Sequence, residues 1–262
     1  MRAALGHSHP RGGRVDLRNG LVNTASVGRD ELDLEPWIER LRDRDPARRA
    51  HAAAVLGAFG PRAKGALPAL LEALKDRAPE VRRKATTALR EVGAEARIAI
   101  PALMNALQDK DELVRRRAIA ALGELGPDAR MAATALIQLL NDESALLRRW
   151  AAAALGEIGP AAPSAIPALI EALCQNDVKN RAVTAAALRK MGTRAIPRLI
   201  DALRHSDANV RRHAAQTLSK TPDGRDAVPA LLSLLGDPDP LVAEAAAIAV
   251  GRLDPEAMAG IS

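Results

Sequence analysis

Apolar and polar positions follow a helical period along this chain, and one pattern of them returns about every 33 residues. Residues 101–126 read PALMNALQDKDELVRRRAIAALGELG, in which a proline opens one apolar series and a polar turn separates it from a second. In the segment 81–92, five apolar residues fall on one face at about 100° per residue, namely Val81, Ala85, Ala88, Leu89 and Val92. The pattern predicts pairs of short amphipathic helices.

The proline that opens each pair gives a count of the units. It stands at 36, 68, 101, 167, 197 and 229, with Thr134 in its place once, and the steps after Pro68 are 33, 33, 33, 30 and 32 residues. A fixed period of this length predicts an all-α solenoid of about seven two-helix units over 34–256. We expect the units near 34–66, 67–99, 100–132, 133–165, 166–195, 196–227 and 228–256, after a flexible basic arm at 1–33 and before a tail at 257–262.

Capping residues mark both ends of each second helix. An acidic or hydroxyl side chain precedes it and is expected to accept a hydrogen bond from a free N–H of the first turn; the candidates are Asp45, Asp111, Ser144, Asp207 and Asp239. In the fifth unit Asn176 and Asp177 come directly before Val178, which we align with the first buried valine of other units. Glycine, often followed by proline, ends most of these helices.

Composition and charge narrow the class of protein. Hydrophobic residues make up 48% of the chain, yet it has one Phe, two Trp and no Tyr, which favours helices packed through small side chains. A single cysteine excludes an intramolecular disulfide, and the apolar runs are too short to span a membrane, so we expect a cytoplasmic protein. Residues 226–262 carry −5, which leaves +11 on the rest and favours a negatively charged partner.

The recurring unit has the pattern IPALIEAL, as from Ile166 to Leu173, followed by a turn, a helix of the type VRRRAIAALGELG and Gly-Pro. This unit resembles HEAT repeats, in particular the short phycobilisome-lyase type. The resemblance implies a right-handed superhelix whose second helices line a concave face. It also implies an Arg–Asp ladder between neighbouring units. By position the ladder bases are Arg49, Arg82, Arg115, Arg148, Lys179 and Arg211, and the acids are Asp45, Asp111, Asp207 and Asp239.

The second helix begins with up to three consecutive bases, and the helical wheel gives them different directions. The middle one points away from the core, so Arg83, Arg116, Arg149 and Arg212, interrupted by Asn180, form an outward column. A row of guanidinium groups suits carboxylates or phosphates, although it could also be only a solvated face. Trp150 lies in a third column with His51, Lys84, Arg117, Arg181 and His213; it could contact a partner or pack on the next unit.

Motifs of enzymes are not found in the sequence. No histidine is followed by the glutamate that iron-binding HEAT proteins carry, and there is no phosphate loop, nucleophile turn or Cys/His cluster. We therefore expect no catalysis, no cofactor and no metal, and interpret the chain as a scaffold that binds an acidic protein along the concave face.

Three other expectations accompany this interpretation. A bilin lyase-like subunit or chaperone is permitted by the repeat type, and binding of nucleic acid is permitted by the charge, although three aromatics are few for that role. The last helix is rich in apolar residues such as Leu241 and Ile248, so we expect that Met258 and Ile261 fold back over it, or that it contacts a partner or another copy.

Overall fold

The computed structural model describes residues 33–175, 177–221 and 223–259. The residues from Leu34 onward form one compact unit, and the description below concerns it. The expected N-terminal arm lies outside the described residues except for Asp33. Within the described residues no helix is both long and apolar enough to cross a membrane.

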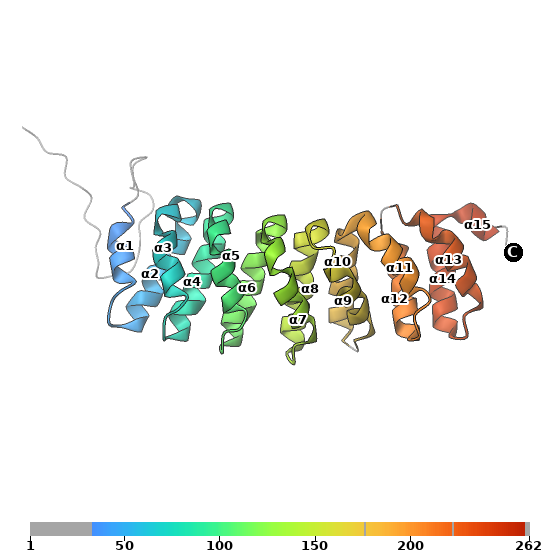
Figure 1. Ribbon diagram of the computed structural model, residues 1–262, viewed down its shortest axis with the longest axis horizontal. Helices are drawn as coiled ribbons and strands as arrows, with labels where there is room; N and C mark the ends of the chain where they lie inside the picture. The colour runs from blue at the N-terminus through green and yellow to red at the C-terminus, as the bar shows by residue number, and fades with distance from the viewer. Residues whose placement is uncertain (1–32, 176, 222, 260–262) are drawn as a thin grey trace, which may run out of the picture. The chain divides into compact units, whose positions relative to one another are not determined.

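Seven helix pairs and one short final helix follow each other along this unit, and the described residues contain no strand (Figure 1). The expected all-α solenoid is therefore confirmed. The pairs are α1 (Glu35–Arg40) with α2 (Pro46–Ala58), α3 (Leu67–Ala73) with α4 (Pro79–Val92), α5 (Ile100–Ala106) with α6 (Glu112–Glu124), α7 (Ala133–Gln138) with α8 (Ala145–Ile158), α9 (Ala165–Glu171) with α10 (Val178–Lys190), α11 (Ile196–Ala202) with α12 (Ala208–Leu218), and α13 (Val228–Ser233) with α14 (Pro240–Leu253). The final helix α15 covers Pro255–Ala259.

Each second helix follows an N-cap residue with an extended backbone conformation. The expected caps are all present, because the side chains of Asp45, Asp111, Ser144, Asp207 and Asp239 accept hydrogen bonds from backbone N–H groups of the first turn. These N–H groups have no partner within the helix, so each cap stabilises its helix by about 1 kcal/mol. In α4 the cap position is Ala78, which has no side-chain oxygen to offer.

Most second helices are followed by a glycine with positive φ, which opens a short 3₁₀ segment. At the end of α4, Gly93 has φ +75°, a conformation that residues with a Cβ rarely adopt. The sixth pair lacks such a glycine, and Asp223 takes the left-handed conformation there with φ +61°. Aspartate tolerates this region better than most residues. The boundary after α12 therefore also uses a residue with positive φ, although no glycine stands there.

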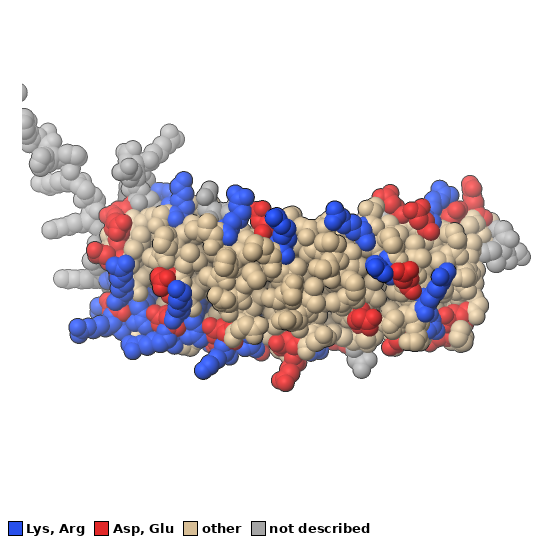
Figure 2. Space-filling view, viewed as in Figure 1, with Lys and Arg blue, Asp and Glu red and all other residues tan. Residues whose placement is uncertain are grey.

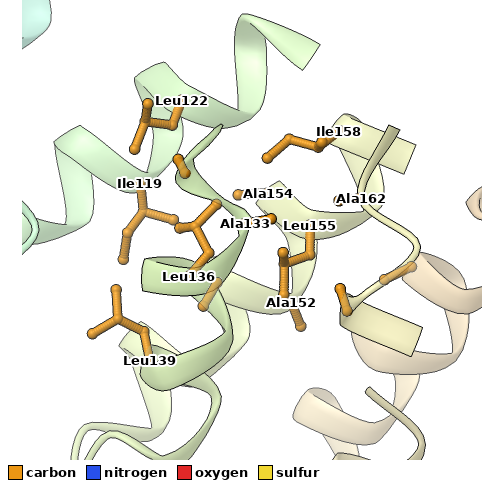
Figure 3. Close-up of a cluster of buried hydrophobic side chains, with 14 of the residues drawn as sticks. Ile119, Leu122, Ala133, Leu136, Leu139, Ala152, Ala154, Leu155, Ile158 and Ala162 are labelled. Carbon is orange, nitrogen blue, oxygen red and sulfur yellow. The ribbon is translucent and has the colours of Figure 1, made fainter. Parts of the chain in front are cut away.

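The core is one continuous cluster of buried side chains from Leu41 to Val250. Figure 3 shows a section of it, in which leucines and isoleucines of α6, α7 and α8 converge while alanines lie where the helices approach each other. The five residues that the sequence placed on the inner face of α4 are all buried. Burial of one such leucine is worth about 1.5–3 kcal/mol, and small residues let the helices come close.

The fifth pair differs from the register that the sequence suggested. Val178 does not take the buried valine position of α10, because Asp177 is the cap and Val178, the first helical residue, is 68% exposed. Asn180 occupies the buried position instead and is 2% exposed. Its amide donates to the carbonyl O of Ala145 at 3.1 Å, which supplies the partner that a buried polar group needs.

The first helices present a face with few charges. The exposed positions of α5 and α7 include Pro101, Asn105, Thr134 and Gln138, and Figure 2 shows that charged side chains lie mainly around the edges of this face. At the end of the solenoid, Met258 of α15 packs against the core, whereas Leu241 and Ile248 of α14 stay about half exposed. Ile261, which was expected to join Met258, lies outside the described residues.

Candidate binding face of the second helices

Arginines at the first turn of the second helices join neighbouring units. Arg82 donates through Nε and Nη2 to the two carboxylate oxygens of Asp109 at 2.6 and 2.7 Å, and through Nη1 to the carbonyl O of Asp76 at 2.8 Å. Asp109 belongs to the turn of the next unit, so each such pair connects two units by a bidentate, charge-assisted contact. The same geometry joins Arg49 to Asp76 and Arg211 to Asp237.

The acids expected in this ladder are corrected by the structure. Asp111 and Asp207 cap α6 and α12, and the ladder carboxylate lies two residues earlier in the turn, as Asp109 does in the third unit. Asp109 also accepts the backbone N–H of Asp111 at 2.9 Å. The ladder acid thus fixes its own turn as well as the preceding unit.

Two ladder positions are incomplete or differently occupied. Arg115 donates to the carbonyl O atoms of Asp109 and Lys110, but its Nε is buried without a partner. Arg148 donates to the neutral amide oxygen of Gln175 at 3.1 Å. In the fifth unit the equivalent base is Arg181, which donates to the carbonyl O of Gln175 at 2.7 Å, and not the expected Lys179, because the register of α10 is shifted.

The outward column of arginines is only partly neutralised. Arg83 donates through Nε to Asp111 at 2.9 Å and is ion-paired with it through Nη2. Arg149 donates to the amide oxygen of Asn180 at 3.0 Å and lies 3.9 Å from a carboxylate oxygen of Asp177. Asn180, where we expected the column to be interrupted, is thus a buried residue of the next unit that accepts a hydrogen bond from Arg149.

The other two members of the column have no acidic partner in the described part of the chain. Arg212 donates to the side-chain oxygen of Asn209 at 3.0 Å, and its Nε is buried without a partner. The guanidinium of Arg116 makes no hydrogen bond or ion pair with any described residue. Their positive charges are therefore available to a ligand.

Trp150 and the base next to Arg116 lie at the centre of the same face. Trp150 of α8 is 38% exposed, which is unusual for so large an apolar side chain. Arg117 donates through Nη1 to the carbonyl O of Arg83 at 2.7 Å and to the hydroxyl of Thr87 at 2.9 Å. These acceptors are neutral, so Arg117 keeps its net charge.

A hollow of about 240 Å³ lies among α4, α6 and α8. Its lining consists of Thr87, Arg90, Arg116, Arg117, Ala120 and Trp150. Arg90 is held at one side of it by ion pairs with Glu91 and with Glu124, the latter at 3.2 Å. The arrangement offers two guanidinium groups without acidic partners and one aromatic side chain to a small anionic group.

The position of Arg90 explains why space exists there. In α2 and α8 the same position is glycine, and a Cβ on Gly57 or Gly156 would lie 2.8 Å from the Cα of Ala88 or Ala187. Glycine thus allows successive second helices to approach closely. An arginine cannot fit into such a contact, so α4 and α6 must stay further apart at this level. A second hollow, of about 150 Å³, is lined by Arg90 and Ala121.

The electrostatics of the face follow from these contacts. Hydrogen bonds from the Arg83 guanidinium lower the pKa of Asp111 to about 2, so this acid is charged at neutral pH. Burial, together with the neighbouring guanidiniums of Arg116, Arg83 and Arg90, lowers the pKa of Arg117. Mutual repulsion of these bases marks the hollow as a place where an anion would be stabilised.

Other chemistry is not assembled on the described residues. No group of three or more His, Cys, Asp and Glu side chains is placed there to hold a metal ion. Cys174 is exposed as a residue. Partial desolvation of its sulfur, together with the negative charges of Asp207 and Glu171, raises the pKa of its thiol. Such a thiol is mostly protonated and therefore a poor nucleophile at neutral pH.

Sequence reasoning missed Thr87 and Arg90 of the hollow, and it named Arg117 only as a member of the same column as Trp150. A signal for Arg90 existed, because it replaces the glycine that four other second helices carry at this position, Gly57, Gly123, Gly156 and Gly251. The contact of Arg117 with Thr87 of the preceding helix depends on how the helices pack, and it has no sequence signal.

Comparison with known proteins agrees with the geometry. The model of HEAT repeats matches residues 34–100, 100–189 and 196–259, and the model of the PBS lyase HEAT-like repeat matches residues 181–205. No curated protein matches the chain.

Among solved structures, the complex of CpcE and CpcF of phycocyanin lyase from Nostoc sp. is similar with 25% identity and a TM-score of 0.51, over 88% of this chain and 99% of the other. An engineered protein matches with 23% identity and a TM-score of 0.54, over 85% of this chain and 68% of the other. Importin beta matches with 13% identity and a TM-score of 0.63, over 84% of this chain and 35% of its own, and these two likenesses concern the fold alone. Repeated helix pairs, the Arg–Asp ladder and the matched residues together show that the chain belongs to the HEAT-repeat proteins.

Proposed function

We propose that this protein is a non-catalytic scaffold that binds an acidic partner protein along the face formed by its second helices. The observation that carries the proposal is the outward arginine column, in which Arg116 and Arg212 lack an acidic partner among the described residues. By contrast, the exposed positions of the first helices α5 and α7, in the middle of the solenoid, carry uncharged side chains. HEAT-repeat solenoids commonly use an extended surface of this kind to bind other proteins.

Charge complementarity supports an acidic partner over a basic one. The chain carries +6 in all, and its last 37 residues are acidic, so the basic character is concentrated in the preceding units. Arginine is well suited to such an interface because its planar fork of donors matches a carboxylate. Two proteins with such an interface associate at a high rate at low salt, and their affinity falls as salt screens the charges.

The test is affinity purification from the source cells with three forms of the protein. In one variant Arg116, Arg149 and Arg212 are changed to Glu. In a matched control the same change is made at three exposed bases outside this face, Arg62, Arg130 and Arg204. We expect the first variant to lose the partners that the wild type and the control retain, with unchanged helical circular dichroism in all three. Retention of the same partners by the first variant would contradict the proposal.

A second candidate function is that of a subunit in a bilin lyase-like complex. The similarity to the CpcE and CpcF complex favours this function, because the matched region covers 88% of this chain and 99% of the other. In this case the protein should change the absorbance or fluorescence of an added bilin, alone or with a second HEAT-repeat subunit. Spectra that stay the same in both mixtures would argue for the scaffold alone.

A further inference from the structure

We propose that the hollow among α4, α6 and α8 binds an oxyanion group, the carboxylate or phosphate of a single side chain, on an extended segment of the partner protein. Arg116 and Arg117 would bind the oxyanion, and Trp150 would pack against the stem of that side chain or its neighbour. The inference rests on the proposed function and names the chemistry and the place of its main contact.

The donors needed for an oxyanion are present and unused. The guanidinium of Arg116 has no hydrogen bond or ion pair to a described residue, so all its donors are free. Arg117 uses Nη1 for the carbonyl of Arg83 and the hydroxyl of Thr87, which fixes its orientation while Nε and Nη2 have no partner on the described residues. Preorganised donors bind better than mobile ones, because less side-chain entropy is lost.

The shape of the hollow fits one side chain better than a longer ligand. Its volume of about 240 Å³ lies below the roughly 300–1,000 Å³ of pockets that enclose drug-sized ligands. It is bounded on one side by Arg90, which Glu91 and Glu124 hold in place. The indole of Trp150 supplies an apolar wall, and its N–H has no acceptor among the described residues, so it can donate to the ligand as well.

The distribution of charge favours a protein segment over nucleic acid. A bound strand needs a continuous track of bases that contact successive phosphates. Here the bases that flank the hollow along the column are already engaged, Arg83 with Asp111 and Arg149 with Asn180 and Asp177. The unmatched charge is therefore local, about the size of one oxyanion, and Trp150 is the only aromatic side chain that lines the hollow.

The experiment measures binding of fluorescent ten-residue peptides to the full chain by anisotropy at low salt. Three peptides differ in one central residue, which is Glu, phosphoserine or Gln. We expect the Glu or the phosphoserine peptide to bind and the Gln peptide to bind at least about tenfold more weakly, since a charge-assisted pair is at stake. The stronger of the two anionic peptides identifies the source of the oxyanion. Equal binding of all three peptides would overturn the proposal.

Variants locate the site. Arg116→Gln should weaken binding of the anionic peptide about tenfold, and Trp150→Ala should weaken it about threefold to tenfold. Arg130→Gln is an equal charge change on the 3₁₀ segment after α6, and it should change the affinity for the peptide less than twofold. Arg90→Gly introduces the glycine that α2, α6 and α8 carry at this position, so α4 and α6 can approach each other. Binding of the peptide should then be lost, while the helical circular dichroism stays unchanged. Equal weakening by Arg130→Gln and Arg116→Gln would overturn the assignment.

A ten-nucleotide single-stranded DNA serves as the competing probe. Tighter binding of this DNA than of either anionic peptide would overturn the choice of a protein partner. The two proposals fail in different ways. If partner capture depends on Arg116, Arg149 and Arg212 but peptide binding ignores Arg116→Gln and Trp150→Ala, the scaffold function stands and the hollow is not its main contact.

Discussion

The carboxylate of Asp111 makes two stabilising contacts at once, one within its own helix and one with the preceding unit. One of its oxygens accepts the backbone N–H of Val114 at 3.0 Å and also the Nε of Arg83 at 2.9 Å. It therefore caps α6 and at the same time holds α4 against the next unit. Its side chain is 16% exposed, so water screens these contacts only in part.

The lowered pKa of Asp111 predicts a pH dependence of stability. Because its pKa falls from 3.8 to about 2 on folding, the unfolded chain binds more protons between these values, and the stabilisation is lost as the pH falls from about 4 to 2. We expect a contribution on the order of 1–2 kcal/mol at neutral pH.

The measurement is urea unfolding of the wild type and of Asp111→Asn at pH 5 and pH 2.5. Asparagine can still cap the helix but cannot be ionised. The wild type should be the more stable form at pH 5, and this difference should shrink at pH 2.5. An unchanged difference at the two pH values would contradict the prediction.

At the scale of elements, the distance between successive second helices depends on one position in each helix. Gly156 of α8 would place a Cβ 2.8 Å from the Cα and 3.0 Å from the Cβ of Ala187, and backbone atoms cannot move aside cheaply. Arg90 occupies the same position in α4, so the spacing differs there and leaves the hollow. The residue at this position thus decides whether two neighbouring second helices pack closely, as with glycine, or leave the hollow, as with Arg90.

Gly156→Ala is therefore expected to lower the free energy of unfolding by about 1–3 kcal/mol, although alanine is the better helix former. The matched control is Gly251→Ala at the equivalent position of α14, where a Cβ would meet nothing within 4 Å. That variant should be neutral or more stable by up to about 1 kcal/mol. Thermal and urea unfolding measure both, and equal effects of the two changes would show that the close contact is not limiting.

These elements could be foreseen from the sequence to different degrees. The cap residues and the inner face of α4 were predicted correctly, because local hydrogen bonds and a period of 3.6 residues decide them. The ladder acids were wrong by two residues, since Asp109 and Asp111 are both plausible acceptors in sequence and only the direction of the turn separates them. The shift of α10 was missed because an asparagine, Asn180, fills a position that is apolar in the other units.

At the scale of the whole solenoid, each unit is stabilised by its two neighbours. Leu136 of α7 is fully buried, between the inner faces of α6 and α8 (Figure 3). Because contacts in such a fold are made with adjacent units, damage to one unit should decay along the row of helices.

Leu136→Ala tests this expectation. The cavity should cost about 2–5 kcal/mol, whereas the half-buried Leu71→Ala should cost less. Hydrogen exchange should show the largest loss of protection in α6, α7 and α8 and a smaller loss in α2 and α14. A uniform loss over all helices would indicate instead that the described solenoid unfolds as a single cooperative unit.

The sequence by itself determined the helical repeat, the caps and the apolar faces, because each depends on residues within one or two turns of each other. It also singled out Arg83, Arg116, Arg149 and Arg212 as outward bases, since the helical wheel requires only the positions of residues along one helix. Tertiary structure alone decided which of these bases are neutralised. The acid that meets Arg83 lies on the next unit, 28 residues away, whereas Arg116 meets no acid on the described residues. The hollow exists because Arg90 stands where close packing requires glycine.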